Sequence, residues 1–448
     1  MQTASAPASF QAGFSRTEIT PPLGTPLAGY FHERLGTRVR DPLFTRAMAL
    51  TNAEGESLII VGLDLICVDH HFADEAKERI REAVGVPPER VLICATHTHT
   101  GPEVREFGAK VSINREWLAQ LVSRIVETVR HAWEHRREAF VRHGKIAGDG
   151  YVFNRLYRKR DGTETLGRKP DSVGPAGPVD EELGVLGAYD AQTGGLLGCL
   201  VNIGIHVDVI GGGSADFISA DWPGEIARAI SGVYGADVVA IFLQGACGDT
   251  AQTPYYPKFN PTRGERKSLS LGRGLAGGAI FAMERAEPMS DGTLSGEIRI
   301  IHIPWYTRTP ELMEEVRQLK EKPELSVQER YQIKAIEEWP YDGQIAPIPL
   351  QALRIGTLSL FAVPAQIFVP ISLEIKHWSP ARQTMLVELA NARMSSYIPT
   401  ANQAERGAYG TRPILSRWLD VDAGRQIADA AFHMLREIQG REDEGMDG

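Results

Sequence analysis

The stretch from residue 44 to residue 96 limits the possible folds most, because it holds apolar runs of strand length around a helix-like segment. Residues 44–50, 57–68 and 90–96 are largely apolar and predict three strands. Residues 72–84 carry charges at helical spacing and are followed by Gly85 and two prolines, which predicts a helix and its end. The order strand, helix, strand indicates a βαβ unit with two parallel strands.

The rest of the chain predicts an α/β fold with mixed central β-sheets flanked by helices. Further strands are expected at residues 186–205, where two strands surround a turn at 191–195, and at 237–243 and 353–363. Further helices are expected at residues 114–140, 310–339 and 422–438. No repeat and no linker divides the sequence, so we expect a single domain over residues 1–439 and an acidic disordered tail over residues 440–448.

Charge and hydropathy exclude several classes of protein. The formal net charge is −9 and no long basic run offsets it, which argues against a nucleic-acid partner. No stretch approaches the ~20 apolar residues of a membrane helix, and the N-terminus lacks the apolar core of a signal peptide. The four cysteines form no CxxC pair, which predicts reduced thiols. We therefore expect a cytoplasmic protein without membrane insertion that binds a small-molecule substrate, and its oligomeric state stays open.

The motif Thr96-His-Thr-His-Thr-Gly-Pro102 follows one of the predicted strands and carries the clearest chemical signal. If the strand continued, His97 and His99 would project to the same side, about 6.6 Å apart along the backbone. Imidazole suits zinc, and a catalytic zinc needs about three protein ligands. The spacing alone leaves two interpretations open: a metal site, or strand-end histidines bonded to backbone carbonyls.

Polar residues also follow the other predicted strands. His206 ends an apolar run before a Gly-rich loop, Asp249 follows the strand at 237–243, and Gln366 and Tyr397 lie beyond the strand at 353–363. Several polar strand ends predict one shared pocket. Cys247 lies beside a Gly-rich turn and has no obvious basic neighbour in the sequence, which argues against a nucleophilic thiol.

Taken together, these segments resemble the catalytic domain of the neutral/alkaline non-lysosomal ceramidase family. The Thr-His-Thr-His-Thr-Gly-Pro element is the most specific part of the resemblance. The other matching segments occur in the same order over nearly the whole chain: Ile19-Thr-Pro-Pro22, Gly29-Tyr30, Asp41 to Ala47, Gly62-Leu-Asp-Leu65, Asn154-Arg155, the strand ending at His206, Ile218-Ser-Ala-Asp221, Gly245-Ala-Cys-Gly-Asp249, Val363-Pro364 and Tyr397.

The resemblance implies a ceramidase-like catalytic domain that uses Zn²⁺ to hydrolyse the amide bond of N-acylated sphingoid bases. By position, His97, His206 and Tyr397 match the zinc ligands, and His99 matches a histidine beside the metal that takes part in catalysis. Arg155 matches an arginine that contacts substrate. The glycine-aspartate pair ending at Asp249 also matches, and we expect Asp249 to support catalysis by orienting a ligand.

Two positions depart from the family pattern. The acidic zinc ligand is replaced by Gln366, whose neutral amide oxygen is a weaker partner for zinc than a carboxylate. The catalytic serine is replaced by Ala251, and Thr250 lies one position early, so that in an extended segment its side chain points the other way. The chain also stops before the family's additional C-terminal β-rich domain, so we expect a smaller, soluble substrate.

Three functions are compatible with these residues. The first is a zinc hydrolase that cleaves an amide or ester bond of a soluble acylated substrate with metal-activated water, helped by His99, Arg155 and Tyr397. The second is a carbohydrate-active hydrolase or lactonase with the same metal pocket, in which Glu103 supplies the acid. The third is a non-catalytic, ceramidase-like binding protein, which the replacements Gln366 and Ala251 favour.

Overall fold

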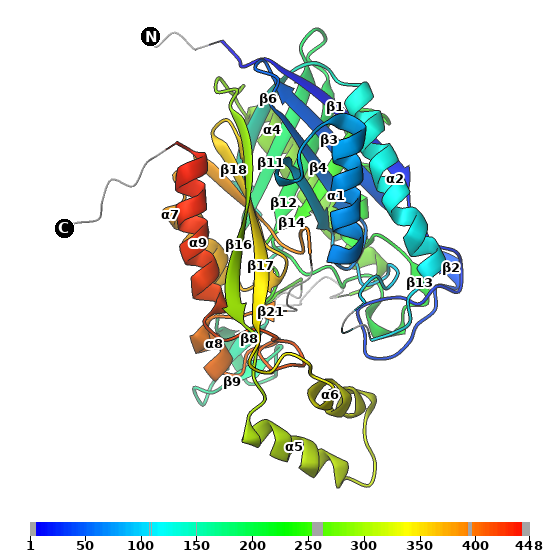
Figure 1. The fold of residues 1–448 in the computed structure, drawn as a ribbon, viewed down its shortest axis with the longest axis vertical. Coiled ribbons are helices and arrows are strands. Elements are labelled where there is room, and N and C mark those ends of the chain that lie inside the picture. The colour runs from blue at the N-terminus through cyan, green and yellow to red at the C-terminus, as the bar shows by residue number, and fades with distance from the viewer. Residues whose placement is uncertain are drawn as a thin grey trace, which may run out of the picture.

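The computed structural model describes residues 6–106, 108, 110–148, 150–252, 263–392 and 397–440, and its central feature is an eight-stranded mixed β-sheet (Figure 1). In spatial order its strands are β14 (Val239–Gln244), β12 (Leu196–Ile203), β11 (Glu182–Asp190), β6 (Arg137–Ala147), β1 (Phe10–Glu18), β3 (Phe44–Asn52), β4 (Ser57–Leu63) and β5 (Val91–Ala95). Among the neighbouring strands of this sheet, the pairs β4–β5 and β12–β14 are parallel and the other pairs are antiparallel. The predicted βαβ unit is confirmed as β4, α1 (His70–Val84) and β5.

A second sheet packs on one face of the first. Its strands are β16 (Leu294–Pro304), β17 (Ile345–Ile355), β18 (Leu358–Ala362) and β20 (Gln383–Val387). Alternate residues of β4 show how the two faces of the large sheet are used: Leu58 and Ile60 join the core between the sheets, whereas Ile59 and Val61 join the core under the helices. Both faces are buried, which explains why such strands are continuously apolar in the sequence.

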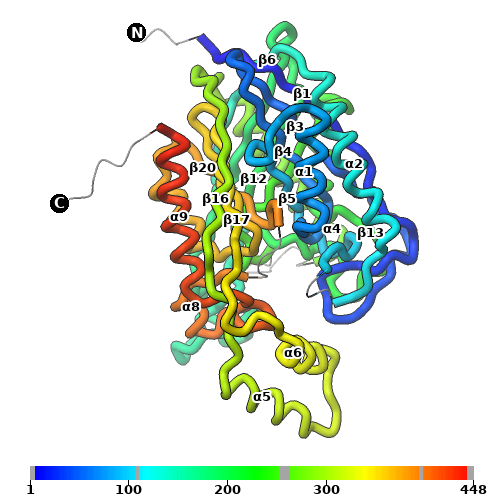
Figure 2. Tube along the Cα trace, viewed as in Figure 1, coloured from blue at the N-terminus to red at the C-terminus, as the bar shows by residue number. Residues whose placement is uncertain are grey.

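Helices cover the outer face of each sheet. Four of them cover the large sheet: α1, α2 (Arg115–Glu134), α3 (Asp221–Tyr234) and α4 (Glu265–Arg285). On the small sheet lie α7 (Val369–Trp378) and α9 (Ala423–Ile438). Figure 2 shows α1 and α2 on one side of the strands and α9 on the other. The predicted α/β fold with mixed central β-sheets flanked by helices is therefore confirmed, and the structure arranges it in four layers.

Several shorter elements complete the chain. A helical hairpin of α5 (Pro310–Lys320) and α6 (Val327–Glu337) projects from the end of the small sheet (Figure 1). The shorter helices are η1 (Pro88–Arg90), η2 (Gly212–Ser214) and α8 (Ala401–Glu405). The shorter strands are β2 (Arg38–Val39), β7 (Phe153–Asn154), β8 (Leu156–Lys159), β9 (Glu164–Leu166), β10 (Ser172–Pro175), β13 (Phe217–Ile218), β15 (Thr250–Ala251), β19 (Gln366–Ile367) and β21 (Tyr397–Ile398).

Three predicted boundaries are wrong. The helix expected over 114–140 ends at Glu134, and β6 starts at Arg137, where alternating burial replaces the helical pattern. The strand expected over 353–363 is the end of β17 and all of β18, joined by a turn at Gly356, whose φ of 54° favours glycine. The run over 57–68 is strand only as far as Leu63. Residues 441–448 of the expected tail lie outside the described residues.

The large sheet curls until its two outer strands meet. β14 approaches β4 so closely that a Cβ atom on Gly62 would lie 2.7 Å from the Ile241 side chain. The segment after β20 then joins both edges: the Glu388 N–H donates to the Gln244 carbonyl of β14, and the Asn391 N–H donates to the Ile93 carbonyl of β5. This closure brings the carboxyl ends of β5 and β12 together.

Candidate metal and substrate site

Three imidazole rings converge beyond the ends of β5 and β12. The His99 Nε2 atom lies 3.3 Å from His97 Nε2 and 3.1 Å from His206 Nε2. The rings of His97 and His206 have centroids 4.5 Å apart. The structure thus brings together the three histidines that the sequence analysis selected, from two segments more than a hundred residues apart.

The two histidines of the motif meet through a turn and not through strand alternation. β5 ends at Ala95, and His97 has a left-handed backbone with a φ of 71°. The His97 N–H donates to the Leu65 carbonyl, which holds the turn against the segment after β4. The strand therefore does not continue through the motif, as the spacing argument assumed, but the two rings still lie together, with their Nε2 atoms 3.3 Å apart.

Backbone contacts fix the loop that carries His99. Its N–H donates to the Val207 carbonyl at 3.3 Å, which ties it to the loop of His206. Arg34 donates to the His99 carbonyl at 2.7 Å, and Tyr30 packs its ring edge-on against the His99 ring. Gly29 is required here, because its φ is 100° and a Cβ atom would lie 2.4 Å from His99 Nδ1.

The hydrogen bond of the His97 ring leaves its Nε2 atom available to a metal. His97 Nδ1 lies 2.7 Å from the Ile66 carbonyl oxygen, which can only accept, so Nδ1 carries the proton. Burial lowers the pKa of His97 to about 4 and the pKa values of His99 and His206 well below their usual range. Neutral imidazoles with a free Nε2 are the form that binds a metal.

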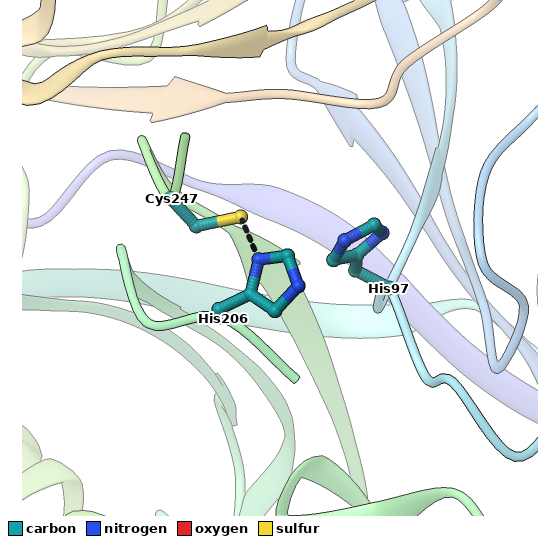
Figure 3. Close-up of side chains that lie close together, drawn as sticks. All are labelled: His97, His206 and Cys247. Carbon is teal, nitrogen blue, oxygen red and sulfur yellow. Dashed lines mark hydrogen bonds between the residues drawn. The ribbon is translucent and has the colours of Figure 1, made fainter. Parts of the chain in front are cut away.

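Cys247 lies beside the Nδ1 atom of His206, on the side of the ring away from His97 (Figure 3). Its Sγ atom is 3.6 Å from His206 Nδ1, and the ligand atoms of His97, His206 and Cys247 all lie within 4.8 Å of one another. Glu388, fully buried, forms a hydrogen bond with the Cys247 thiol and accepts the Ile367 N–H at 2.9 Å. Burial raises the pKa of Cys247 well above its usual value, so the thiol stays protonated. The sequence analysis missed this basic neighbour, since residues 206 and 247 meet only in the fold.

A cavity of about 510 Å³ opens in front of the histidines. Arg155, Gln366, Tyr397, Asp208 and Ala251 are among the residues that line it. Gln366 and Tyr397 are paired neighbours in the two short parallel strands β19 and β21. The Gln366 Oε1 atom is buried and has no hydrogen-bond donor among the described residues. An acceptor in that condition is available to a ligand.

Asp249 lies outside the group of histidines. One carboxylate oxygen accepts the Val369 N–H at 2.8 Å, and the other accepts from the side chains of Asn154 and Gln403. These bonds hold the start of α7 and the Arg155 segment together, because the Arg155 N–H also donates to the Asp249 carbonyl. Asp249 thus supports the cavity wall. It positions the segment of Arg155, whereas the sequence analysis expected it to orient a metal ligand.

The structure also shows what lies at the position where the family pattern has its catalytic serine. Ala251 lines the cavity, whereas the Thr250 hydroxyl points away and donates to the Gly204 carbonyl at 3.1 Å. Thr250 and Ala251 form the extended strand β15, which agrees with the expected alternation. Neither residue presents a hydroxyl to the histidines.

The sequence analysis overlooked Asp208, which lies two residues after His206 and lines the same cavity. Its carboxylate accepts from the Tyr30 hydroxyl at 2.6 Å and pairs with Arg263 at 3.1 Å. No spacing pattern links these three residues in the sequence. The resemblance covered Tyr30 but did not assign it a function.

Other candidate residues have structural partners. Glu103 forms an ion pair with Arg105 and accepts the N–H groups of Val104 and Arg105, so its carboxylate is already used. Asp64 is fully buried and accepts from Arg46 and the Phe44 N–H, which fits a structural function. Within the described residues, no helix is both long and apolar enough to cross a bilayer.

Comparisons with known proteins define the fold. No family model matches the sequence, and no curated protein matches it either. Among solved structures, neutral ceramidase from Pseudomonas aeruginosa matches with a TM-score of 0.78 at 19% identity, over 99% of this chain and 76% of that one. A ceramidase complexed with C2 matches with a TM-score of 0.76 at 18% identity, over 98% and 77% of the two chains. Similarity at this identity defines the architecture only. The chain therefore has the neutral-ceramidase fold, with a buried His97, His206 and Cys247 group that could hold a metal.

Proposed function

We propose that this protein is a zinc-dependent hydrolase that cleaves an amide or ester bond of a soluble acylated substrate. The observation that carries the proposal is the spacing of the three Nε2 atoms. Zn–N distances of about 2.0–2.1 Å place neighbouring ligands of a tetrahedral site about 3.3–3.4 Å apart. The His99 Nε2 atom lies 3.3 and 3.1 Å from its two neighbours.

In this proposal His97, His99 and His206 hold the metal. The third imidazole would give the metal a third strong ligand, so that binding does not depend on Gln366, which stands where the family pattern has a carboxylate. Two further oxygen atoms are available to the metal: Gln366 Oε1, which has no hydrogen-bond donor among the described residues, and the hydroxyl of the adjacent Tyr397. Among the described residues, no aspartate or glutamate joins the histidines in a compact ligand group.

When bound, zinc would polarise the substrate carbonyl and lower the pKa of a water molecule towards 7. The side chains around it perform the other functions. Burial raises the pKa of Tyr397, so its phenol stays protonated and can donate to a developing oxyanion. Arg155 is positioned by a 2.5 Å bond from its Nε to the Thr250 carbonyl and can hold a substrate oxygen.

The alternative of a carbohydrate-active hydrolase or lactonase, with Glu103 as its acid, receives less support from the structure. The carboxyl group assigned to it, Glu103, is held in an ion pair and is absent from the cavity lining. Because Ala251 removes the serine hydroxyl, the proposed reaction uses water and not a serine nucleophile. Four buried free cysteines agree with a reducing compartment, and we propose a cytoplasmic location.

The test is metal analysis combined with hydrolysis assays. Purified protein should contain about one zinc per chain and hydrolyse acyl amides or esters until a chelator removes the metal. His97→Ala and His206→Ala should each lose the zinc and the activity, and His302→Ala, at an exposed position on β16, should keep both. Protein that folds, binds no zinc and turns over no acyl substrate would establish the non-catalytic alternative instead.

A further inference from the structure

The charged side chains around the cavity are unevenly distributed. Five cationic residues line it, Arg105, Lys110, Arg155, Arg168 and Arg263, and Asp208 is the one carboxylate among the described lining residues. A cavity with this lining attracts anions.

Two of the cations are neutralised locally. Arg105 is paired with Glu103 directly behind it, and Arg263 is paired with Asp208. Arg155 differs from both, because no ion pair to it is found among the described residues. Its neighbours are the phenols of Tyr397 and Tyr409, and its guanidinium lies 4.3 Å from the centre of the Tyr409 ring. A guanidinium held by phenols and a backbone carbonyl keeps its full charge for a ligand.

The position of Arg155 limits where the anionic group of a ligand can lie. Arg155 lines the same cavity as His97, His99 and His206, and the bond from its Nε to the Thr250 carbonyl holds it in that wall. An anion bound to Arg155 therefore lies in the same cavity as the histidines, which face the carbonyl to be attacked. Apolar lining residues, including Phe31, Leu166 and Leu415, leave room for an acyl chain on the same ligand.

We propose that the substrate is an N-acyl α-amino acid or a close analogue, whose carboxylate binds Arg155 while its acyl carbonyl faces the three histidines. This inference rests on the proposed function. In the reaction, the oxygen of water bonds to the carbonyl carbon, the C–N bond breaks, and a proton passes to the leaving amino group. The products are a free fatty acid and an amino acid. The cavity volume is within the range of about 300–1,000 Å³ that small-molecule sites occupy.

The experiment compares two ligands that differ only in the anionic group. Binding of an N-hexanoyl amino acid and of its α-carboxamide to metal-free protein is measured by calorimetry. A charge-assisted contact is worth about 1.5–3 kcal/mol, so the acid should bind about 10- to 100-fold more tightly than the amide. Raising the salt concentration should weaken binding of the acid and leave binding of the amide unchanged.

Three variants test whether Arg155 causes the preference for the acid. In Arg155→Met the two ligands should bind equally, and in Arg155→Lys the preference for the acid should fall but persist. Arg158→Met, at an exposed position on β8 outside the cavity, should keep the full preference. Circular dichroism checks that the variants are folded. If Arg155→Met does not fold, the salt dependence of the wild type and the Arg155→Lys result decide.

Equal affinity of the wild type for the acid and the amide would overturn the inference, as would an acid preference that survives in Arg155→Met. Because binding is measured without metal, failure of the hydrolase proposal is seen separately. Protein that prefers the acid but hydrolyses neither ligand after zinc loading would keep the inference and reject the proposed function. Zinc-loaded protein that hydrolyses neutral acyl amides as well as the acids would keep the proposed function and reject the inference about the substrate.

Discussion

Single side chains decide whether the site can hold a metal, and the least expected of them is Cys247. Its thiol lies against Nδ1 of His206, on the opposite side of the ring from the Nε2 atom that faces His99. One metal ion cannot use both nitrogens of the same ring. If Nε2 binds the ion, Cys247 and Glu388 act on the far side of His206, where such contacts orient ligands.

We predict that Cys247 positions His206 and does not bind the metal. Cobalt(II)-substituted protein should lack the intense near-ultraviolet band of a thiolate ligand. Cys247→Ala should weaken metal affinity about 10- to 100-fold, measured by competition with a chelator. Cys199→Ala makes the same change at a buried cysteine in β12 and should leave the affinity unchanged. A thiolate band that disappears in Cys247→Ala would show that Cys247 is itself a ligand.

A second residue-scale prediction concerns Lys77, which is buried in α1. Burial lowers its pKa to about 7, whereas the unfolded chain keeps a pKa near 10.5. Between these values the unfolded state binds one more proton, so the stability of the wild type should rise with pH from about 7 to 10.5. Lys77→Met should remove this rise and stabilise the protein at pH 7 by about 1–3 kcal/mol.

Denaturant unfolding at several pH values measures both effects. Lys334→Met, at an exposed position on α6, serves as the control and should leave the pH profile of the wild type unchanged. A profile for Lys77→Met that still rises over this range would show that Lys77 is not the source.

At the scale of elements, two neighbouring parallel strands position the metal site through glycines. Gly204 follows β12 and Gly245 follows β14, and a Cβ atom on Gly204 would lie 2.2 Å from the Ala246 carbonyl oxygen. His206 and Cys247 come two residues after these glycines. The close contact of the two loops therefore sets the distance between the imidazole and the thiol.

Gly204→Ala should accordingly destabilise the protein by about 1–3 kcal/mol and lower its metal affinity, because the Ala246 backbone must move. Gly232→Ala on α3 is the matched control: nothing lies within 4 Å of the new methyl group, and a helical alanine should add about 0.5–1 kcal/mol of stability. Thermal unfolding and zinc titration of both variants check the prediction. Unchanged zinc affinity in Gly204→Ala would show that the loop contact does not set the site.

At the scale of the whole molecule, the segment after β20 ties the two sheets to each other. The Asn391 side chain accepts the Ile93 N–H of β5 and donates to Gln351 of β17, and Gln351 donates to the carbonyls of Glu89 and Val91. Asn391 itself has a φ of 62°, which asparagine tolerates better than most residues. The sheets are thereby joined by buried hydrogen bonds as well as by apolar packing.

We expect the described residues to unfold as one domain. Calorimetry should give a single transition with equal calorimetric and van't Hoff enthalpies. Asn391→Ala should lower the stability by about 2–4 kcal/mol, since it leaves buried partners unsatisfied and strains the backbone, and should keep the single transition. Asn402→Ala, on the exposed helix α8, should change stability little. Two separate transitions would show that the sheets are independent domains.

The local pattern of the sequence was enough for the βαβ unit, the β11–β12 hairpin and the helices α1 and α9, because apolar periodicity reports which faces are buried. Helix α4 could not be expected, since its glycines lower helix propensity. The glycines are explained by the close packing of α4 on α3, because a Cβ atom on Gly272 would lie 2.3 Å from the Glu225 side chain. The motif and its order also selected His97, His99, His206, Arg155, Gln366 and Tyr397, which the fold places around one cavity.

The sequence by itself determined which residue types are present and which segments are buried strands, and hence the class of the fold. The tertiary structure alone decided that Cys247 and Glu388 lie on the Nδ1 side of His206 and that Asp208 faces the cavity. It also decided that Arg155 lies beside two phenols and, among the described residues, forms no ion pair. These contacts join residues far apart in the chain, and local periodicity contains no information about distances between segments. The closure of the large sheet, which brings β14 against β4 and β5, is what sets those distances.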